Sequence, residues 1–202
     1  MVEVPAELAP YLDELVERVG GHVPIEAAYL LGSAATGAFE PGQSDVDVIV
    51  VTPRQLSARE KQVVVDEIDA LPCPARTLEL AVYARGRDEY ELNFIKGEFV
   101  SYDAARDPSW WYVLERATAE AHAVQLAGPP WREVFAPVPR EAILDALVGA
   151  LDWQEQNEST DRGTLLNNAR ALAWLETGEW LTKPEAARWL RRYLRTAIEA
   201  AR

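Results

Sequence analysis

The residues with the clearest chemical meaning are a Gly-Ser pair at residues 32–33 and an Asp-x-Asp pair, Asp45 and Asp47. The second pair leads directly into the apolar run of residues 48–51. Because side chains alternate along a strand, Asp45 and Asp47 should point to the same face. Two carboxylates on one face repel each other unless a cation lies between them, and Mg²⁺ prefers hard oxygen ligands. The spacing therefore indicates metal-dependent chemistry on a nucleotide.

A third acid, Glu79, lies within the segment at residues 78–83, which otherwise has the composition of a buried strand. A carboxylate in such a strand costs several kcal/mol unless it is paired, hydrogen-bonded or close to a metal. The alternative is an edge strand with Glu79 facing water, which would be preferred for an isolated glutamate. After Gly-Ser and Asp-x-Asp, the order of the motifs favours a functional role for Glu79.

Strand and helix patterns alternate over the first half of the chain. A Ser-x-x-Glu capping box at residues 57–60 predicts the start of the second helix. Together, the elements predict a mixed α/β sheet flanked by helices. The expected strands are residues 27–31, 46–52, 77–84 and 92–95, and the expected helices are residues 5–19 and 57–71.

The second half of the chain has helical patterns, and strand patterns end at about residue 95. A helix at residues 112–127 is expected to end at Gly128, and further helices are expected at residues 139–156, 162–177 and 182–201. The sequence thus predicts an α/β domain at residues 1–136 and an all-α helical-bundle domain at residues 137–202.

Composition narrows the choice of compartment and partner. The 202 residues carry a formal net charge of −13, which argues against a nucleic acid partner. An acidic surface attracts cationic partners, but it also keeps a protein in solution, and the charge alone does not separate these two interpretations. The single cysteine, Cys73, excludes an internal disulfide and fits a reducing compartment. The N-terminus has no secretion signal, and no apolar run approaches the roughly 20 residues that cross a bilayer. We therefore expect a cytoplasmic protein, without a membrane or nucleic acid partner, that is a monomer.

The motifs resemble the nucleotidyltransferase superfamily related to DNA polymerase β. Residues 28–51 and 77–83, with residues 167–178 and 182–189 of the helical half, resemble the aminoglycoside 3″-adenylyltransferases that modify streptomycin and spectinomycin. The resemblance implies a nucleotidyltransferase domain followed by a helical domain, with ATP as co-substrate. It also implies transfer of AMP to a hydroxyl of a small cationic antibiotic, with release of pyrophosphate, from a site between the two domains.

The resemblance assigns roles residue by residue. Asp45 and Asp47 would bind Mg²⁺, and Glu79 would be the general base. From the residues alone, Arg170 and Lys183 would be surface residues, and Trp153 a packing residue. The resemblance instead implies ATP contacts by Gly32, Ser33, Ser44, Arg170 and Lys183, and acceptor contacts by Phe99, Trp153 and Asp161.

Two alternatives to this function remain open from the sequence. The first is the same chemistry on a protein hydroxyl, as in transferases of the antitoxin type, or on another small molecule. The second is a nucleotide-binding module without turnover. The helical second domain argues against the first alternative, and the complete set of three acids argues against the second.

Overall fold

The computed structural model describes residues 4–200 and divides into two compact units. The first unit extends to Ala146 and the second begins at Leu147. The division falls inside helix α6 (Arg140–Gln156). The boundary expected from the sequence, after residue 136, lies in the connection that precedes this helix.

The first unit is built on a six-stranded sheet with the strand order β5-β4-β3-β2-β1-β6. Strands β2 and β3 are parallel, whereas the other neighbouring pairs are antiparallel. The predicted mixed sheet is therefore confirmed. The strands are β1 (Ala27–Leu30), β2 (Val46–Thr52), β3 (Leu78–Ala84), β4 (Leu92–Ile95), β5 (Phe99–Ser101) and β6 (Val124–Ala127).

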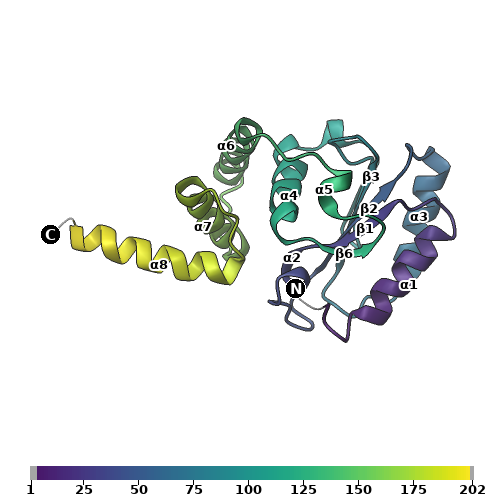
Figure 1. Ribbon diagram of the computed structural model, residues 1–202, viewed down its shortest axis with the longest axis horizontal. Helices are drawn as coiled ribbons and strands as arrows, with labels where there is room; N and C mark the ends of the chain where they lie inside the picture. The colour runs from purple at the N-terminus through teal and green to yellow at the C-terminus, as the bar shows by residue number, and fades with distance from the viewer. Residues whose placement is uncertain (1–3, 201–202) are drawn as a thin grey trace. The chain divides into compact units, whose positions relative to one another are not determined.

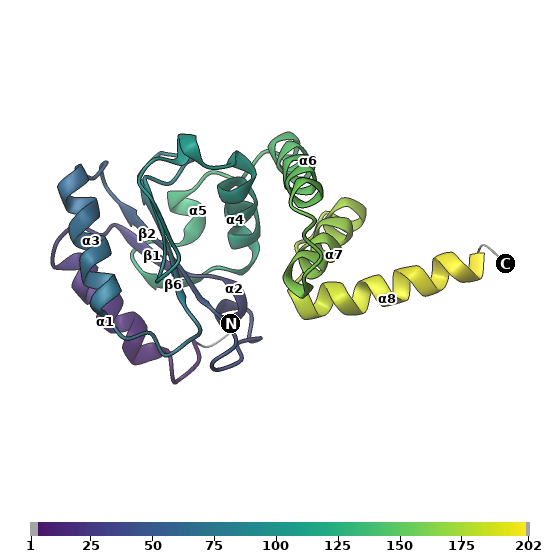
Figure 2. The ribbon, with the colours of Figure 1, turned by 180° about the vertical axis from the view of Figure 1, so that it is seen from behind.

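Helices cover both faces of this sheet, with α1 and α3 on one face and α4 and α5 on the other (Figures 1 and 2). The alternation of side chains along β2 explains this arrangement, since Val48 packs toward α1 and α3 and Ile49 packs toward α4 and α5. The helices that lie wholly within this unit are α1 (Ala9–Gly20), α2 (Gly32–Ala35), α3 (Ala58–Ala70), the 3₁₀ turn η1 (Ala104–Arg106), α4 (Ser109–His122) and α5 (Trp131–Val134).

The parallel pair β2 and β3 is joined by α3, which makes the crossover that parallel strands require. The predicted capping box begins this helix: Ser57 accepts a hydrogen bond from the backbone N–H of Glu60, and Glu60 accepts one from the backbone N–H of Ser57. The crossover fixes the register of the two strands, and Asp47 lies directly beside Glu79.

The expectation that strands end at residue 95 is wrong, because β5 and β6 follow β4. Strand β5 has three residues, too few to show an alternating pattern. The other correction concerns the helix expected at residues 112–127. It ends at His122, and the next residues form β6, which pairs with β1. Residues 124–127 suit either structure by composition, so the long-range pairing with β1 decides between them.

The second unit is helical, as predicted, with the remainder of α6, α7 (Arg162–Thr177) and α8 (Lys183–Ala200). Gly178 ends α7 in the left-handed conformation, at φ 77°. The amide of Asn168 donates to Gln154 across 2.8 Å, which links α7 to α6. Across residues 4–200, every helix is too short or too polar to cross a membrane.

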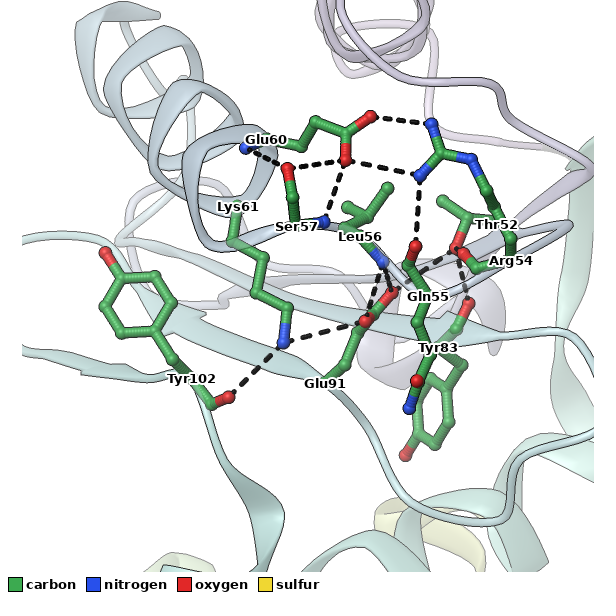
Figure 3. A network of polar contacts seen from close by, with 10 residues as sticks. All are labelled: Thr52, Arg54, Gln55, Leu56, Ser57, Glu60, Lys61, Tyr83, Glu91 and Tyr102. Carbon is green, nitrogen blue, oxygen red and sulfur yellow. Dashed lines mark hydrogen bonds and ion pairs between the residues drawn. The ribbon is translucent and has the colours of Figure 1, made fainter.

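A buried acid, Glu91, holds the end of β2 that is opposite to Asp47 (Figure 3). Its carboxylate accepts hydrogen bonds from the backbone N–H of Leu56, at 3.1 and 2.9 Å, and from the hydroxyl of Thr52 at 3.4 Å. The ammonium of Lys61 lies 3.6 Å away. Glu91 thus links the end of β2 to the loop that leads into α3.

We expect the replacement Glu91→Gln to lower the free energy of unfolding of the first unit by about 2–4 kcal/mol, because it leaves Lys61 without a counter-ion and turns an amide NH₂ toward donors. The measurement is urea unfolding of the first unit. The matched control is Glu141→Gln, an exposed acid in the first turn of α6, which should change stability by less than about 0.5 kcal/mol. Equal stabilities of the two variants would contradict the structural role of Glu91.

Candidate active site

The three acids singled out by the sequence come together at one end of the parallel strands. Asp47 and Glu79 are direct neighbours on β2 and β3, so their side chains share the face covered by α4. Asp45 precedes β2, and its negative charge also acts on Glu79. The predicted convergence of Asp45, Asp47 and Glu79 is confirmed, while their roles stay predictions.

Gly32 packs directly against the carboxylate of Asp47. A Cβ atom at Gly32 would lie 1.7 Å from Oδ2 of Asp47, and the backbone at Gly32 has φ +62°, which disfavours other residues. The backbone N–H of Leu31 donates to the carbonyl of Asp47 at 2.8 Å and keeps the two segments together. Only glycine therefore allows the turn at the start of α2 to lie this close to Asp47.

Asp45 is held on one side only. Its Oδ2 accepts a hydrogen bond from the guanidinium of Arg76 at 2.6 Å, within an ion pair. Its Oδ1 is buried and has no hydrogen-bond partner among the described residues. A buried carboxylate oxygen without a partner is costly in free energy, and a bound cation would remove that cost.

Burial and the neighbouring negative charges raise the pKa of Glu79. Burial, followed by the charges of Asp47, Asp45 and Glu115, raises the pKa of Glu79 to about 8, and the guanidinium of Arg76 opposes that rise. A carboxylate with a raised pKa is a stronger base than an ordinary glutamate, provided that it is deprotonated when the reaction occurs. The environment of Glu79 therefore suits a general base.

Glu115 of α4 is a fourth acid at the site, and the sequence analysis missed it. The hydroxyl of Tyr83 donates to its carboxylate at 2.9 Å, and Tyr83 lies four residues after Glu79 on the same face of β3. Burial, and then the charge of Asp47, raises the pKa of Glu115 to about 7. The sequence held one signal for this position. Glu115 lies three residues after Tyr112 and four before Ala119, so it shares the face of α4 that these two buried residues turn toward the sheet.

The donor set fits magnesium shared with a nucleotide. Among residues 4–200, no three His, Cys, Asp or Glu side chains form a group that could hold a metal by themselves. Mg²⁺ is usually held by one or two carboxylates together with substrate phosphates, rather than by a complete protein cage. Asp45 and Asp47 supply two such carboxylates, and the unpartnered Oδ1 of Asp45 supports the fit.

The raised pKa values predict how stability depends on pH in the metal-free protein. Because the folded protein binds the protons of Glu79 and Glu115 more tightly than the unfolded chain, stability should fall as pH rises from about 5 to about 8. The lowered pKa values of Glu60 and Asp161, each about 2, act only below this range. We expect the melting temperature to fall by roughly 5 °C across the range.

Thermal unfolding at several pH values, with and without Mg²⁺, measures this effect. Mg²⁺ should raise the melting temperature more at pH 8 than at pH 5, because protons compete with the metal for the acids. The variant Glu79→Gln should show a shallower dependence on pH. A melting temperature that rises steadily toward pH 8 without metal would contradict these pKa shifts.

Aromatic side chains extend the site along the sheet. Phe99 of β5 lies on the same face of the sheet as the acids. The strand register pairs Asp47 with Glu79, Glu79 with Ile95, and Ile95 with Phe99. The ring of Trp111, one helical turn before Glu115 on α4, lies 5.6 Å from the ring of Phe99. The acceptor contact predicted for Phe99 is compatible with this position and stays a prediction.

Two family models match separate parts of the chain. The model of the nucleotidyltransferase domain matches residues 12–101, which include the three acids. The model of the aminoglycoside adenylyltransferase C-terminal domain matches residues 133–202. The chain belongs to the aminoglycoside adenylyltransferase family. It is thus a nucleotidyltransferase, as the sequence motifs predicted.

Relatives of this aminoglycoside adenylyltransferase family align over most of the chain. The aminoglycoside (3″)(9) adenylyltransferases of Shigella flexneri and Escherichia coli are each 27% identical to it over 215 residues, which cover 92% of this chain and 79% of theirs. A spectinomycin adenyltransferase from Enterococcus faecialis, solved with ATP and spectinomycin, superimposes with a TM-score of 0.68. It is 14% identical and covers 91% of this chain and 83% of its own, so this likeness shows a shared fold.

The two serines expected to contact ATP lie next to Gly32 and to Asp45 in the chain. Ser33 is in the single turn of α2, next to Gly32, and no side chain of the described residues caps that turn. Ser44 closes a turn, because its hydroxyl accepts a hydrogen bond from the backbone N–H of Glu40 at 3.0 Å. Its carbonyl accepts one from the N–H of Arg76. The phosphate contacts of both serines stay predictions.

The remaining predicted site residues belong to the helical unit. Arg170 donates to the carbonyl of Leu181 at 2.8 Å, and its guanidinium carbon lies 5.8 Å from the ring centre of Trp180. Lys183 is exposed at the start of α8. Trp153 is exposed on α6. The carboxylate of Asp161 caps α7, accepting hydrogen bonds from the backbone N–H groups of residues 163 and 164. The ligand contacts of these four residues stay predictions.

Proposed function

We propose that this nucleotidyltransferase transfers AMP from ATP to a hydroxyl of an aminoglycoside-type antibiotic. The observation that carries the proposal is the pairing of Asp47 with Glu79 on adjacent strands, with Gly32 packed against Asp47. The helical unit of the adenylyltransferase family and the relatives named above support an aminoglycoside as the acceptor. The net charge of −13 also favours a cationic acceptor.

The reaction follows from the chemistry of these residues. The acceptor hydroxyl oxygen attacks the α-phosphorus of ATP, and the bond from that phosphorus to the β-phosphate oxygen breaks, so pyrophosphate leaves. Glu79 takes the proton of the hydroxyl as the new bond forms. Asp45 and Asp47 would hold Mg²⁺, which neutralises the charge of the triphosphate when it is bound. Backbone amides at Gly32 and Ser33 can donate to phosphate oxygens.

The other assignments belong to the same proposal. Ser44, Arg170 and Lys183 contact the triphosphate, where two positive charges would favour the departing pyrophosphate. Phe99, Trp153 and Asp161 contact the acceptor, because aromatic faces and carboxylates attract cationic groups. The resemblance to the family supports both the triphosphate contacts and the acceptor contacts. The acceptor contact of Phe99 has further support, because Phe99 lies on the face of the sheet that carries the acids.

Pyrophosphate release with ATP and Mg²⁺, measured for streptomycin, spectinomycin and several unrelated aminoglycosides, tests the proposal. We expect release to depend on an acceptor, and the product to carry one AMP group by mass spectrometry. Labelled ATP with a cell lysate is the companion assay, in which a labelled protein band would favour the protein-modifying alternative. ATP binding without release for any acceptor would contradict the proposed transfer.

A further inference from the structure

Arg76 lies beside the acids of the site, with its guanidinium against Asp45. Its guanidinium makes one side-chain hydrogen bond among the described residues, to Oδ2 of Asp45 at 2.6 Å. The side chain is 54% exposed, so it can move without breaking buried contacts. Its backbone is fixed, because the N–H of Arg76 donates to the carbonyl of Ser44. Because the backbone is held beside Ser44, a change of rotamer moves the guanidinium only within the reach of one arginine side chain from Asp45.

Arg76 and a metal ion would compete for the same carboxylate. Asp45 is one of the two acids proposed to hold Mg²⁺, and its exposed oxygen is already paired with Arg76. The positive charge of Arg76 also attracts the carboxylate of Glu79, and this attraction offsets part of the repulsion among the acids. The carboxylates of Asp45 and Asp47 together already carry more negative charge than this single guanidinium can balance.

We propose that Arg76 is the counter-ion of Asp45 in the nucleotide-free protein and moves to the triphosphate when the metal–ATP complex binds. This inference rests on the proposed function, because it takes Asp45 as a metal ligand and ATP as the substrate. A guanidinium released from a carboxylate is well suited to phosphate oxygens, which it can bind through two N–H groups. The exchange would make binding of the metal and of ATP mutually favourable.

The exchange predicts effects of opposite sign in the variant Arg76→Gln. Without its competitor, Asp45 should bind a metal more tightly, so the affinity for Mn²⁺ alone should rise by about 3- to 10-fold. Without a cation for the phosphates, the affinity for ATP in the presence of Mg²⁺ should fall by about 10-fold. A residue that only supported the fold would lower both affinities.

Electron paramagnetic resonance of free Mn²⁺ measures the first affinity, and calorimetric titration of ATP with and without Mg²⁺ measures the second. The matched control is Arg85→Gln, which removes an exposed arginine at the other end of β3 that pairs with Glu26. It should change neither affinity by more than about twofold. Arg76→Lys keeps the charge and should retain most of the ATP affinity, and melting temperatures check that each variant folds.

Each outcome separates this inference from the proposed function. Opposite shifts in Arg76→Gln support the exchange. If the unaltered protein binds Mn²⁺ and ATP, but Arg76→Gln matches it or loses both affinities together, the inference fails and the proposed transfer stands. If the unaltered protein does not bind ATP, the proposed function fails, and the inference fails with it. Absence of Mn²⁺ binding at millimolar concentration in both proteins also overturns the exchange.

Discussion

The variant Glu79→Gln is expected to lower the turnover number by about 10²–10⁴-fold, while the affinity for ATP stays within about threefold. Glutamine keeps the size of the side chain beside Asp47 but cannot accept the proton of the acceptor hydroxyl. The loss should therefore appear in kcat and not in nucleotide binding. Pyrophosphate release at saturating ATP and acceptor measures the first quantity, and calorimetric titration of ATP measures the second.

The matched control is Glu120→Gln, a half-buried acid of α4 whose ion pair with Arg132 is long, at 3.8 Å. It should retain turnover within about twofold, since an ion pair of this kind contributes little. Glu79→Gln with at least half of the original turnover would contradict the assignment of the general base. A parallel loss of ATP affinity would instead place Glu79 among the groups that hold the nucleotide.

The variant Gly32→Ala is expected to lower turnover by at least about 10²-fold, because displacements of about 1 Å at a reacting site have effects of this size. The added Cβ would lie 1.7 Å from Oδ2 of Asp47, so either the turn or the carboxylate must move. The turn is proposed to contact the triphosphate, and the carboxylate is proposed to hold Mg²⁺. We therefore expect weaker ATP binding in the presence of Mg²⁺ as well, measured by calorimetric titration.

The control for Gly32→Ala is Gly86→Ala, which has a similar positive φ of +76° but no atom within 4 Å of the added Cβ. It should lower stability by roughly 1 kcal/mol through backbone strain and leave turnover unchanged. The comparison separates the strain of a positive φ from the contact with Asp47. Similar turnover in the two variants would mean that Gly32 does not support the position of Asp47.

The sequence predicted the part of the site that depends on local periodicity. Asp45, Asp47 and Glu79 were placed correctly because strand alternation and one helical crossover fix their faces and register. The capping box at the start of α3 was also predicted, from the four residues 57–60, and it is confirmed. In these cases the deciding interactions lie within a short stretch of chain.

The features that the sequence analysis missed depend on contacts between distant segments. Strand β6 forms because residues 124–127 pair with β1, about a hundred residues earlier. Glu115 joins the site because α4 packs with that face toward Tyr83. Arg76 reaches Asp45 across two strand ends. The hydrophobic periodicity of a single helix or strand does not show how a helix is oriented on the sheet. It also does not show which residues distant in the sequence form ion pairs.

The most direct test of the active site is a crystal structure of this protein with Mg²⁺ and an ATP analogue that has a methylene group between the α- and β-phosphorus atoms. The account predicts metal density bonded to Asp45 and Asp47, with the carboxylate of Glu79 on the side of the α-phosphate and Gly32 beside the triphosphate. Metal or triphosphate bound away from Asp45 and Asp47, or Glu79 turned into solvent in that complex, would contradict it.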